Sequence, residues 1–438
     1  MKVKNLLFAL AAMLFAATAA AQKFHSVQSP DGDITTAEGV RYYLYDDDNT
    51  AMLVGCRDFA EESYEIPQYV TGKDGTKYEV TEIYREAFLK INSLESVTIP
   101  KSVKVVGYSA FGKCKKLKTV NSPNTFMGYV GTGVFDGTPW LTDYKAKYKN
   151  QLVYWCGWVI EESGVIDDED LEIHEGYVGI VTKMWECKSY GVVIPKSLEW
   201  IEPGAFSQMP NLTYFSVSKV NPYYYWKAKA LYRKSNIISK NSGYDRAGDG
   251  NYLSVYPRKQ GMTKQYITEP GVVGIDRAAF YGVKYLKEVI VSEGVKYIGS
   301  EAFHEVEMLE YLQLPSTIEE MEGAVGDCSN LKTIVIPAAK KPELRRTGQT
   351  FSGCSPDLII YVPANLLEEY KADKAYTNYA KEIRAIDSQV VGIEQAKTGG
   401  DAEVKAIYST DGTRLNAMQK GVNIVKMGDG TVRKVVRK

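Results

Sequence analysis

Two runs of acidic side chains are the first candidates for chemistry in this sequence of 438 residues. Residues 46–49 (Asp-Asp-Asp-Asn) place four oxygen-bearing side chains between two alternating apolar runs, a set that could contact calcium, but they lack the Gly and Glu spacing of a helix-loop-helix calcium site. Residues 167–170 (Asp-Asp-Glu-Asp) offer carboxylates, and glycoside hydrolysis needs two of these held about 5–10 Å apart in a cleft, whereas adjacent residues point in different directions. We therefore expect a polar hairpin turn at the first run and a solvated loop at the second.

Histidine and cysteine give equally little material for catalysis or metal binding. The three histidines, His25, His174 and His304, are scattered along the chain, and His174 lies in a strand-like segment. No Ser or Cys nucleophile motif stands near a histidine, and there is no glycine-rich phosphate loop, C-x-x-C pair or Cys/His cluster spaced for zinc. The sequence therefore predicts no enzyme, no catalytic residue, no cofactor and no metal site.

Internal repeats organise the chain around these residues. Leu94, Val97 and Ile99 set a template of one apolar residue, a second three positions later and a third two beyond. Its period-2 part indicates a short strand with one buried face, and a following proline such as Pro100 ends the strand. The template recurs at Leu117/Val120, Leu212/Phe215/Val217, Leu286/Val289/Val291, Leu309/Leu312/Leu314 and Leu331/Ile334/Ile336.

A second template interlocks with the first. It places an aliphatic residue five positions before a Phe, and the distance from Phe88 to Phe111, like that from Phe280 to Phe303, is 23 residues. One such coil cannot bury its apolar face without a coil above and below it, so the coils must stack. We therefore predict a mainly β solenoid: an irregular leucine-rich repeat array of coils of about 23 residues with short parallel strands, plus small β-hairpin segments at both ends.

The combined pattern L-x-x-V-x-I-P…V-x-x-x-A-F-x-x-C resembles the BspA-like leucine-rich repeat proteins, over roughly residues 60–385. Two further stretches are similar to the same group: Asn221-Pro222 through Leu231-Tyr232 resembles its hairpin between repeats, and residues 351–370 resemble its closing coil. Members are common as surface or secreted proteins of anaerobic gut and oral bacteria. The resemblance implies adhesion to host or bacterial surfaces.

The repeat register also bears on the cysteines. Cys114, Cys328 and Cys354 each stand three residues after the Phe position of a coil, where cysteine acts as a small apolar residue. Six cysteines in an exported chain also allow a disulfide reading. We expect free, structural thiols.

The array is irregular, and both ends differ from it. We expect a signal peptide at 1–21, an N-terminal β segment and first coil at 22–79, and the solenoid at 80–386 with insertions at about 136–190 and 218–268. Trp185 and Cys187 mark at most one degenerate coil within the first insertion. Residues 387–403 are expected to be a linker, followed by a β-hairpin tail at 404–438.

The first 21 residues predict export. Lys2 and Lys4 precede an apolar run over residues 6–17, and three alanines ending at Ala21 offer a cleavage site. That run is too short for a transmembrane helix, and no later apolar run of about 18 residues follows. We expect a secreted protein, extracellular or on the outer-membrane surface, with no membrane-spanning segment.

The tail carries a second resemblance. Its order I-Y-x-x-x-G-x-x…K-G-V-x-I-V-x…G…K-V-V resembles the C-terminal sorting domains of proteins exported by the Bacteroidetes type IX secretion system. The resemblance implies sorting or surface retention. A solvated β-hairpin with a charged end is the alternative.

Charge argues against a nucleic-acid partner. Lys and Arg total 53 against 54 Asp and Glu, so no general field attracts nucleic acid or anionic lipid. The unusual count is 32 tyrosines.

Candidate binding residues follow from the repeat, because residues between the buried positions of each strand point outward from the concave sheet of a leucine-rich solenoid. A face of Tyr, Thr, Ser and Gln suits protein or glycan contact, and an ordinary wet sheet face is the alternative. An aromatic cluster at 223–226 could stack on a ligand or pack onto the solenoid. The candidates are Ser96, Thr98, Tyr214, Ser216, Glu288, Tyr311, Gln313 and Thr333 on the face, and Tyr223, Tyr224, Tyr225 and Trp226 in the insertion.

These expectations describe a secreted or cell-surface leucine-rich repeat protein, a monomer, that presents a rigid surface to a host or bacterial surface protein or a glycan. The alternative is a structural or spacer component of the cell envelope without a specific ligand.

Overall fold

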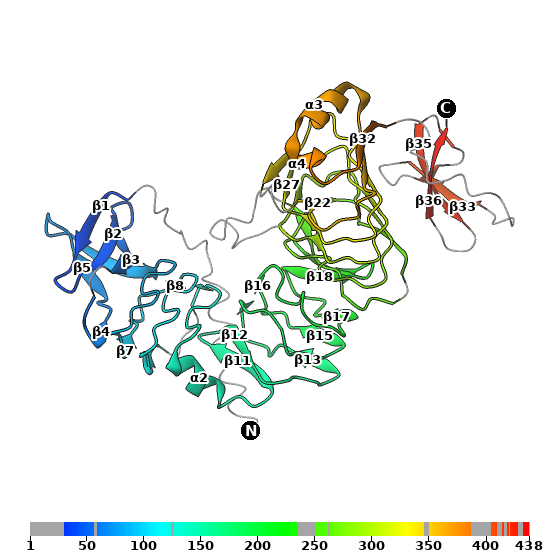
Figure 1. The fold of residues 1–438 in the computed structure, drawn as a ribbon. Helices are drawn as coiled ribbons and strands as arrows, with labels where there is room; N and C mark the ends of the chain where they lie inside the picture. The colour runs from blue at the N-terminus through cyan, green and yellow to red at the C-terminus, as the bar shows by residue number, and fades with distance from the viewer. Residues whose placement is uncertain are drawn as a thin grey trace. The chain divides into compact units, whose positions relative to one another are not determined.

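The computed structural model describes residues 30–56, 59–123, 127–234, 250–261, 263–345 and 350–386, and in the tail 404–409, 414–415, 418–419, 421–427 and 432–437. The chain is a β-solenoid of about 12 turns with little helix and coils about 23 residues apart, which confirms the predicted fold class (Figure 1). It divides into two compact units, Met1–Asp245 and Arg246–Lys438. The predicted signal peptide and linker lie outside the described residues.

Each coil contributes two short parallel strands. In unit 2, Glu288 pairs with Tyr311 and Tyr311 with Thr333, so equivalent residues follow one another at the repeat length. The apolar residues of these strands point inward: Leu312 and Ile334 are fully buried. The strands are short because each coil must turn back toward its next strand within one repeat.

Unit 2 holds two long parallel sheets, ordered β21-β23-β26-β29-β31-β32 and β20-β22-β24-β27-β30, with a smaller β25-β28 pair. Their strands are β20 (Asn251–Val255), β21 (Gln265–Ile267), β22 (Val272–Ile275), β23 (Glu288–Ile290), β24 (Tyr297–Ile298), β25 (Phe303–His304), β26 (Tyr311–Gln313), β27 (Glu320–Glu322), β28 (Val325–Gly326), β29 (Thr333–Val335), β30 (Glu343–Arg345), β31 (Ile359–Val362) and β32 (Glu382–Ala385). We call the first of these sheets the β26 sheet.

Unit 1 has the same two-sided plan in shorter sections, with sheets β4-β7-β9, β13-β15-β17 and β11-β12-β14-β16, and a seven-stranded sheet that begins with β1-β2-β3-β6. Its elements are β1 (Gly32–Thr35), β2 (Val40–Tyr45), β3 (Thr50–Cys56), β4 (Ser63–Glu65), β5 (Tyr69–Thr71), β6 (Lys77–Ile83), β7 (Ser96–Thr98), β8 (Val105–Val106), β9 (Thr119–Asn121), β10 (Tyr129–Val130), α2 (Pro139–Lys145), β11 (Gln151–Trp155), β12 (Trp158–Ser163), β13 (Asp170–Glu172), β14 (Gly179–Ile180), β15 (Gly191–Ile194), β16 (Trp200–Ile201), β17 (Tyr214–Val217), β18 (Tyr224–Lys227) and β19 (Ala230–Arg233).

The Phe positions of successive coils form a stacked aromatic column inside each unit. Phe88, Phe111 and Phe135 stack nearly parallel, with ring centroids 5.3 and 5.6 Å apart. In unit 2, Phe280 stacks on Phe303 at 4.8 Å. Burying each ring contributes about 1.5–3 kcal/mol, but only when the next coil covers it, so the stack stabilises every coil through its neighbours.

The cysteines are free thiols, as expected, in the described part of the chain. Cys114 and Cys328 are fully buried, and each Sγ donates a 3.0 Å hydrogen bond to the carbonyl of the Phe in the preceding coil, Phe88 and Phe303 respectively. This bond explains why cysteine stands three residues after the Phe position.

The two insertions are narrower than predicted, because coils with other side chains at the Phe position fill part of each range. Met184 is fully buried, and its amide donates to the carbonyl of Ala205 just before Phe206, as Phe88 does to Ala110. The Tyr256 amide likewise donates to the carbonyl of Ala279, just before Phe280, and the rings of Tyr256 and Phe280 stack with centroids 5.2 Å apart. Residues from β13 onward, and β20 and β21, therefore belong to the array.

Both ends of the array are closed by other elements. At the N-terminal end, β1, β2 and β3 pair antiparallel, and residues 46–49 form the predicted turn between β2 and β3. At the end of unit 2 lie η2 (Ala364–Leu366), α3 (Leu367–Ala372) and α4 (Lys374–Thr377). Their Tyr370 and Tyr376 are fully buried, with the Tyr376 ring 5.9 Å from Phe351, so they cap the last coil.

The tail forms one antiparallel sheet rather than separate hairpins. Its order is β34-β33-β35-β36, with β33 (Val404–Tyr408) between β34 (Arg414–Leu415) and β35 (Gly421–Met427), and β36 (Val432–Arg437) at the edge. Asn423 is fully buried and exchanges two hydrogen bonds of 2.8 Å with the backbone of Gln419.

Candidate ligand-binding surfaces

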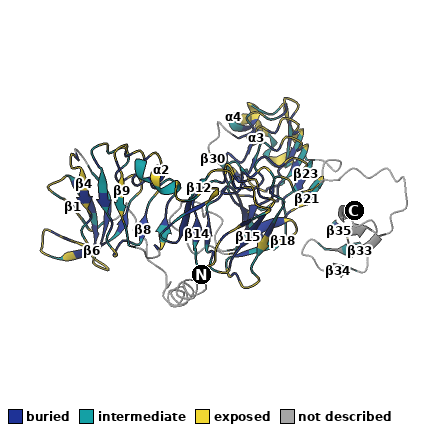
Figure 2. Ribbon diagram, turned by 90° about the horizontal axis from the view of Figure 1, so that it is seen from below, coloured by how far each residue is buried: buried dark blue, intermediate teal, exposed yellow. Residues whose placement is uncertain are grey.

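The outward face of the β26 sheet carries two columns of side chains in register. Buried and partly exposed positions alternate along its short strands. Figure 2 colours the ribbon by the burial of each residue. One column holds three predicted candidates, Glu288, Tyr311 and Thr333. The other holds a fourth, Gln313, beside Val335, which is 2% exposed and is not available to a ligand. The columns run Gln265, Glu288, Tyr311, Thr333, Ile359, Glu382 and Ile267, Ile290, Gln313, Val335, Tyr361, Arg384.

Tyr311 lies at the centre of this face. Its hydroxyl donates to Gln313 Oε1 at 3.1 Å, and burial raises the pKa of Tyr311 to about 12. The phenol is therefore neutral at physiological pH and half-buried. Apolar Ile290 and Ile359 are half-exposed nearby, and Glu288 lies in the neighbouring strand. The centre of the face is amphipathic, with the Glu288 charge beside Tyr311, and further charges, Glu382 and Arg384, lie on the edge strand β32.

In unit 1, the predicted Ser96 and Thr98 are half-buried on β7, between Ser63/Glu65 on β4 and Thr119/Asn121 on β9. Apart from Glu65, these two columns are made of short polar side chains. Their chemistry is that of an ordinary wet sheet face.

Tyr214 on β17 is fixed by the neighbouring coils. Its hydroxyl donates a short hydrogen bond to Asp170 Oδ1, two strands away. The Tyr214 side chain therefore crosses Gly191 on the strand between them. A Cβ at Gly191 would meet Asp170 Oδ1 at 2.2 Å and the Tyr214 ring at 2.4 Å, so only glycine allows this approach. The Asp170 carboxylate raises the pKa of Tyr214. The fourth residue of the acidic run is thus part of strand β13, a correction to the expected loop; Ser216, next on the face, is exposed.

The aromatic cluster of the insertion packs onto the solenoid. It lies on the β18–β19 hairpin, which begins where buried Asn221 accepts from the amides of Tyr223 and Tyr224. Tyr224 is 2% exposed, and its hydroxyl accepts a hydrogen bond from the Ile201 amide at 2.8 Å. It is therefore not available to a ligand, which corrects the prediction that Tyr224 binds one. Tyr225 stacks on Tyr232, and Trp226 lies 5.7 Å from Phe215; both stay half-exposed.

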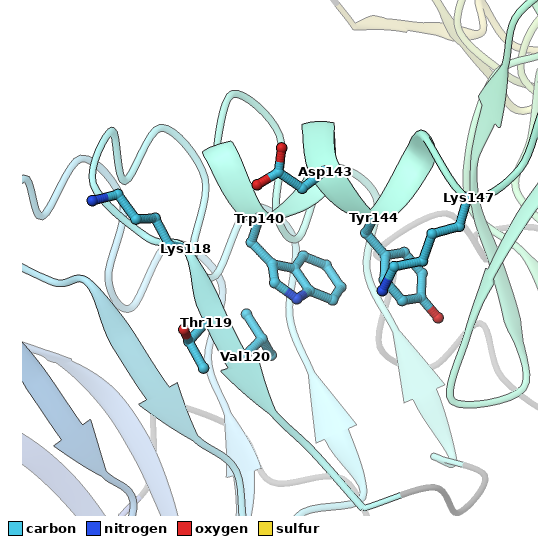
Figure 3. A pocket seen from close by; sticks show the side chains of 7 residues that line it. All are labelled: Lys118, Thr119, Val120, Trp140, Asp143, Tyr144 and Lys147. Carbon is cyan, nitrogen blue, oxygen red and sulfur yellow. The ribbon is translucent and has the colours of Figure 1, made fainter.

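A pocket that the sequence reasoning missed lies between β9 and α2 (Figure 3). Trp140 lies between Val120 and Tyr144, and its ring stacks on that of Tyr144 with centroids 4.7 Å apart. The pocket volume is about 210 Å³. Its lining residues are Lys118, Thr119, Val120, Trp140, Asp143, Tyr144 and Lys147.

The aromatic rings continue beyond the pocket. The ring centroids of Tyr148 and Tyr144 are 5.6 Å apart. The Tyr144 hydroxyl donates a hydrogen bond to the carbonyl of Tyr154. The Tyr154 ring in turn stacks on that of Tyr177, with centroids 3.9 Å apart. All five rings are half-exposed. We call Trp140, Tyr144, Tyr148, Tyr154 and Tyr177 the α2 band. Its signal in the sequence is the spacing of four between Trp140 and Tyr144, which puts both on one side of α2, whereas Tyr148 lies beyond the end of that helix.

Catalytic and metal-binding candidates do not gather. His174 is exposed, with its ring 5.7 Å from that of Tyr154. Across the described ranges, no group of three His, Cys, Asp or Glu side chains is arranged to hold a metal ion. No helix in that part of the chain is long and apolar enough to cross a membrane.

Residues 76–153 and 259–370 match the BspA type leucine rich repeat region, in six copies. Together with the stacked coils, this makes the chain a leucine-rich repeat protein. In these two stretches its repeats are of the BspA type. No curated protein matches the chain.

Several solved structures are similar to it. A leucine rich cell surface protein of Faecalibacterium prausnitzii A2-165 is 22% identical, covering 83% of this chain and 97% of that one, with a TM-score of 0.39. The pneumococcal vaccine antigen PcpA is 15% identical, covering 82% and 100%, with a TM-score of 0.32. A leucine-rich repeat protein of Bacteroides ovatus ATCC 8483 is 19% identical, covering 80% and 99%, with a TM-score of 0.26.

Proposed function

We propose that this leucine-rich repeat protein is exported to the cell surface or beyond and binds a macromolecular ligand there, a host or bacterial surface protein or a glycan. The observation that carries the proposal is the outward face of the β26 sheet. Half-exposed Tyr311, Gln313 and Thr333 stand in register beside apolar side chains on a backbone fixed by parallel pairing. A rigid, amphipathic face of low charge loses little entropy when it binds.

The test is binding of the purified chain from residue 22 onward to a glycan array and to a panel of extracellular-matrix proteins. Tyr311→Ala is the test variant and Tyr285→Ala the control, because Tyr285 is 42% exposed on the same unit outside the sheet face. A specific hit that is lost with Tyr311→Ala but kept with Tyr285→Ala supports the proposal. Circular dichroism checks that both variants stay folded.

The alternative function is a spacer in the cell envelope without a specific ligand. The short polar column around Ser96 and Thr98 favours it for that section of unit 1. No hit on either panel would support the spacer.

For the tail, we propose a role in sorting or surface retention. The support is its resemblance to type IX sorting domains together with its separate four-stranded sheet. Deleting residues 404–438 should leave the repeats folded and shift the protein from the cell surface of the source bacterium into another fraction. Unchanged surface display would contradict this role.

A further inference from the structure

We propose that the pocket between β9 and α2 binds a sugar ring of an acidic polysaccharide, with the chain continuing along the α2 band. The inference deepens the proposed function, because it rests on ligand binding and names a ligand class. It uses a surface other than the β26 sheet, so the two can fail separately.

The first argument is the exposure of the aromatic rings. The Phe column of unit 1 is fully buried, and Tyr224 of the hairpin nearly so. Every ring of the α2 band keeps part of its surface exposed, although Trp140, Tyr144 and Tyr148 also pack against the hydrophobic core. Aromatic faces carry partial negative charge and attract the partly positive C–H groups of a sugar ring, and a phenol hydroxyl that already donates a hydrogen bond can still accept one. Tyr144 and Tyr148 hydroxyls lie 3.3 Å apart along the band.

The second argument is charge. The stretches 113–118 and 143–149, which flank the pocket, hold seven lysines and one acid, Asp143. Glu95 forms ion pairs with Lys116 at 3.5 Å and with Lys118 at 4.0 Å. Glu161 pairs with Lys145 at 3.7 Å. The chain as a whole is nearly neutral, so this excess of lysines is local. A local positive field favours an anionic ligand.

The third argument is the placement of polar groups at the pocket itself. Lys118 and Lys147 lie on opposite sides of Trp140, and the Lys147 ammonium is 5.0 Å from the centre of the Tyr144 ring (Figure 3). Ammonium groups suit the carboxylate or sulfate of an acidic sugar. The Asp143 carboxylate accepts only, so it suits the hydroxyl groups of a sugar.

The size of the pocket sets how much of the ligand enters. Its volume of about 210 Å³ is below the range of about 300–1,000 Å³ typical of drug-sized ligands. One ring can enter, and further rings must lie along the band. We therefore expect longer chains to bind more tightly than single acidic sugars.

The experiment is a calorimetric titration of the full chain at two salt concentrations. The ligands are polygalacturonate, heparin, neutral dextran and a single-stranded oligonucleotide. We expect binding to an acidic polysaccharide that weakens as salt rises, and none to dextran. Lys118→Gln/Lys147→Gln should raise Kd about tenfold or more. Trp140→Phe, which keeps a ring against Phe135, should raise it several-fold.

The matched control is Lys73→Gln/Lys77→Gln, two exposed lysines elsewhere on unit 1, which should change Kd less than twofold. Equal losses in both double variants would overturn the inference, as would tight binding of dextran, preference for the oligonucleotide, or no binding by the wild type. If Tyr311→Ala abolishes an array hit while Lys118→Gln/Lys147→Gln leaves all binding intact, only the pocket inference fails. If no ligand binds at all, the proposed function fails with it.

Discussion

Glu162 shows how one buried acid positions a turn of the array. It is 5% exposed, and its Oε1 accepts from the amides of Trp185 and Glu186 at 2.5 and 2.6 Å. Burial raises the pKa of Glu162 despite these two bonds, which oppose the rise. The carboxyl therefore supports the coil but is easier to bury when protonated.

This sets a pH dependence. A raised pKa means that the contribution of Glu162 to stability is complete below its ordinary pKa of about 4.3 and decreases as pH rises through the raised value. Glu162→Gln keeps an acceptor for the two amides and never ionises. We expect the free energy of unfolding of the variant, relative to wild type, to rise from pH 4 to pH 8 in urea titrations. Exposed Glu175→Gln is the control.

Glu162→Ala, in contrast, leaves both amides without the acceptor. It should lower stability by about 1–3 kcal/mol at pH 4 and by less at pH 8, where wild-type Glu162 contributes less. If the difference in the free energy of unfolding between Glu162→Gln and wild type stays constant from pH 4 to pH 8, the account of Glu162 is contradicted.

The thiols give a second prediction at this scale. Burial raises the pKa of Cys114 to about 11, whereas half-buried Cys354 has its pKa lowered by a hydrogen bond with the Cys328 thiol. Because the thiolate is the reactive form, iodoacetamide at pH 8 should alkylate Cys354 faster than Cys114 in the native chain. Site-resolved mass spectrometry measures the two rates, and unfolding in guanidinium should equalise them. Faster alkylation of Cys114 would show that its coil is not packed as described.

At the scale of elements, the coil at Met184 tests the register of the array. The sequence marks this degenerate coil by Trp185, five positions after Ile180, but Met184 is the buried residue and Trp185 is 61% exposed. Met184→Ala should cost about 2–5 kcal/mol, and Trp185→Ala less than about 0.5 kcal/mol. Urea unfolding of the two variants measures both. The opposite order would restore the register that the sequence indicates.

The same coil shows what a sequence of this kind can predict. Strands such as β7 and β26 were predicted because their inward positions accept only apolar residues at fixed spacing. Met184 was missed because a flexible side chain fills the Phe site without following the template. The bond from Tyr214 to Asp170 joins residues 44 positions apart, and the α2 pocket joins β9 to a helix outside the repeat, so neither has a signal in one coil.

At the scale of the whole molecule, function depends on faces that no single coil forms. The β26 sheet assembles its outward columns from six strands, and α3 and α4 cover its last coil with Tyr370 and Tyr376. The predicted candidates Glu288, Tyr311, Gln313 and Thr333 come together on that face, whereas Ser96 and Thr98 lie on another sheet. Ligand binding should therefore be lost when the face is blocked, even if the repeats remain folded.

The most direct measurement blocks the face with one bulky charge. Thr333→Arg places a guanidinium beside Tyr311, and Ser329→Arg places the same group at an exposed position in the turn before β29. Both variants are compared with wild type for binding to the ligand identified on the arrays, with circular dichroism as the check of folding. The account predicts that Thr333→Arg abolishes binding and Ser329→Arg retains it. Full binding by folded Thr333→Arg would contradict the central claim that the β26 sheet face holds the ligand.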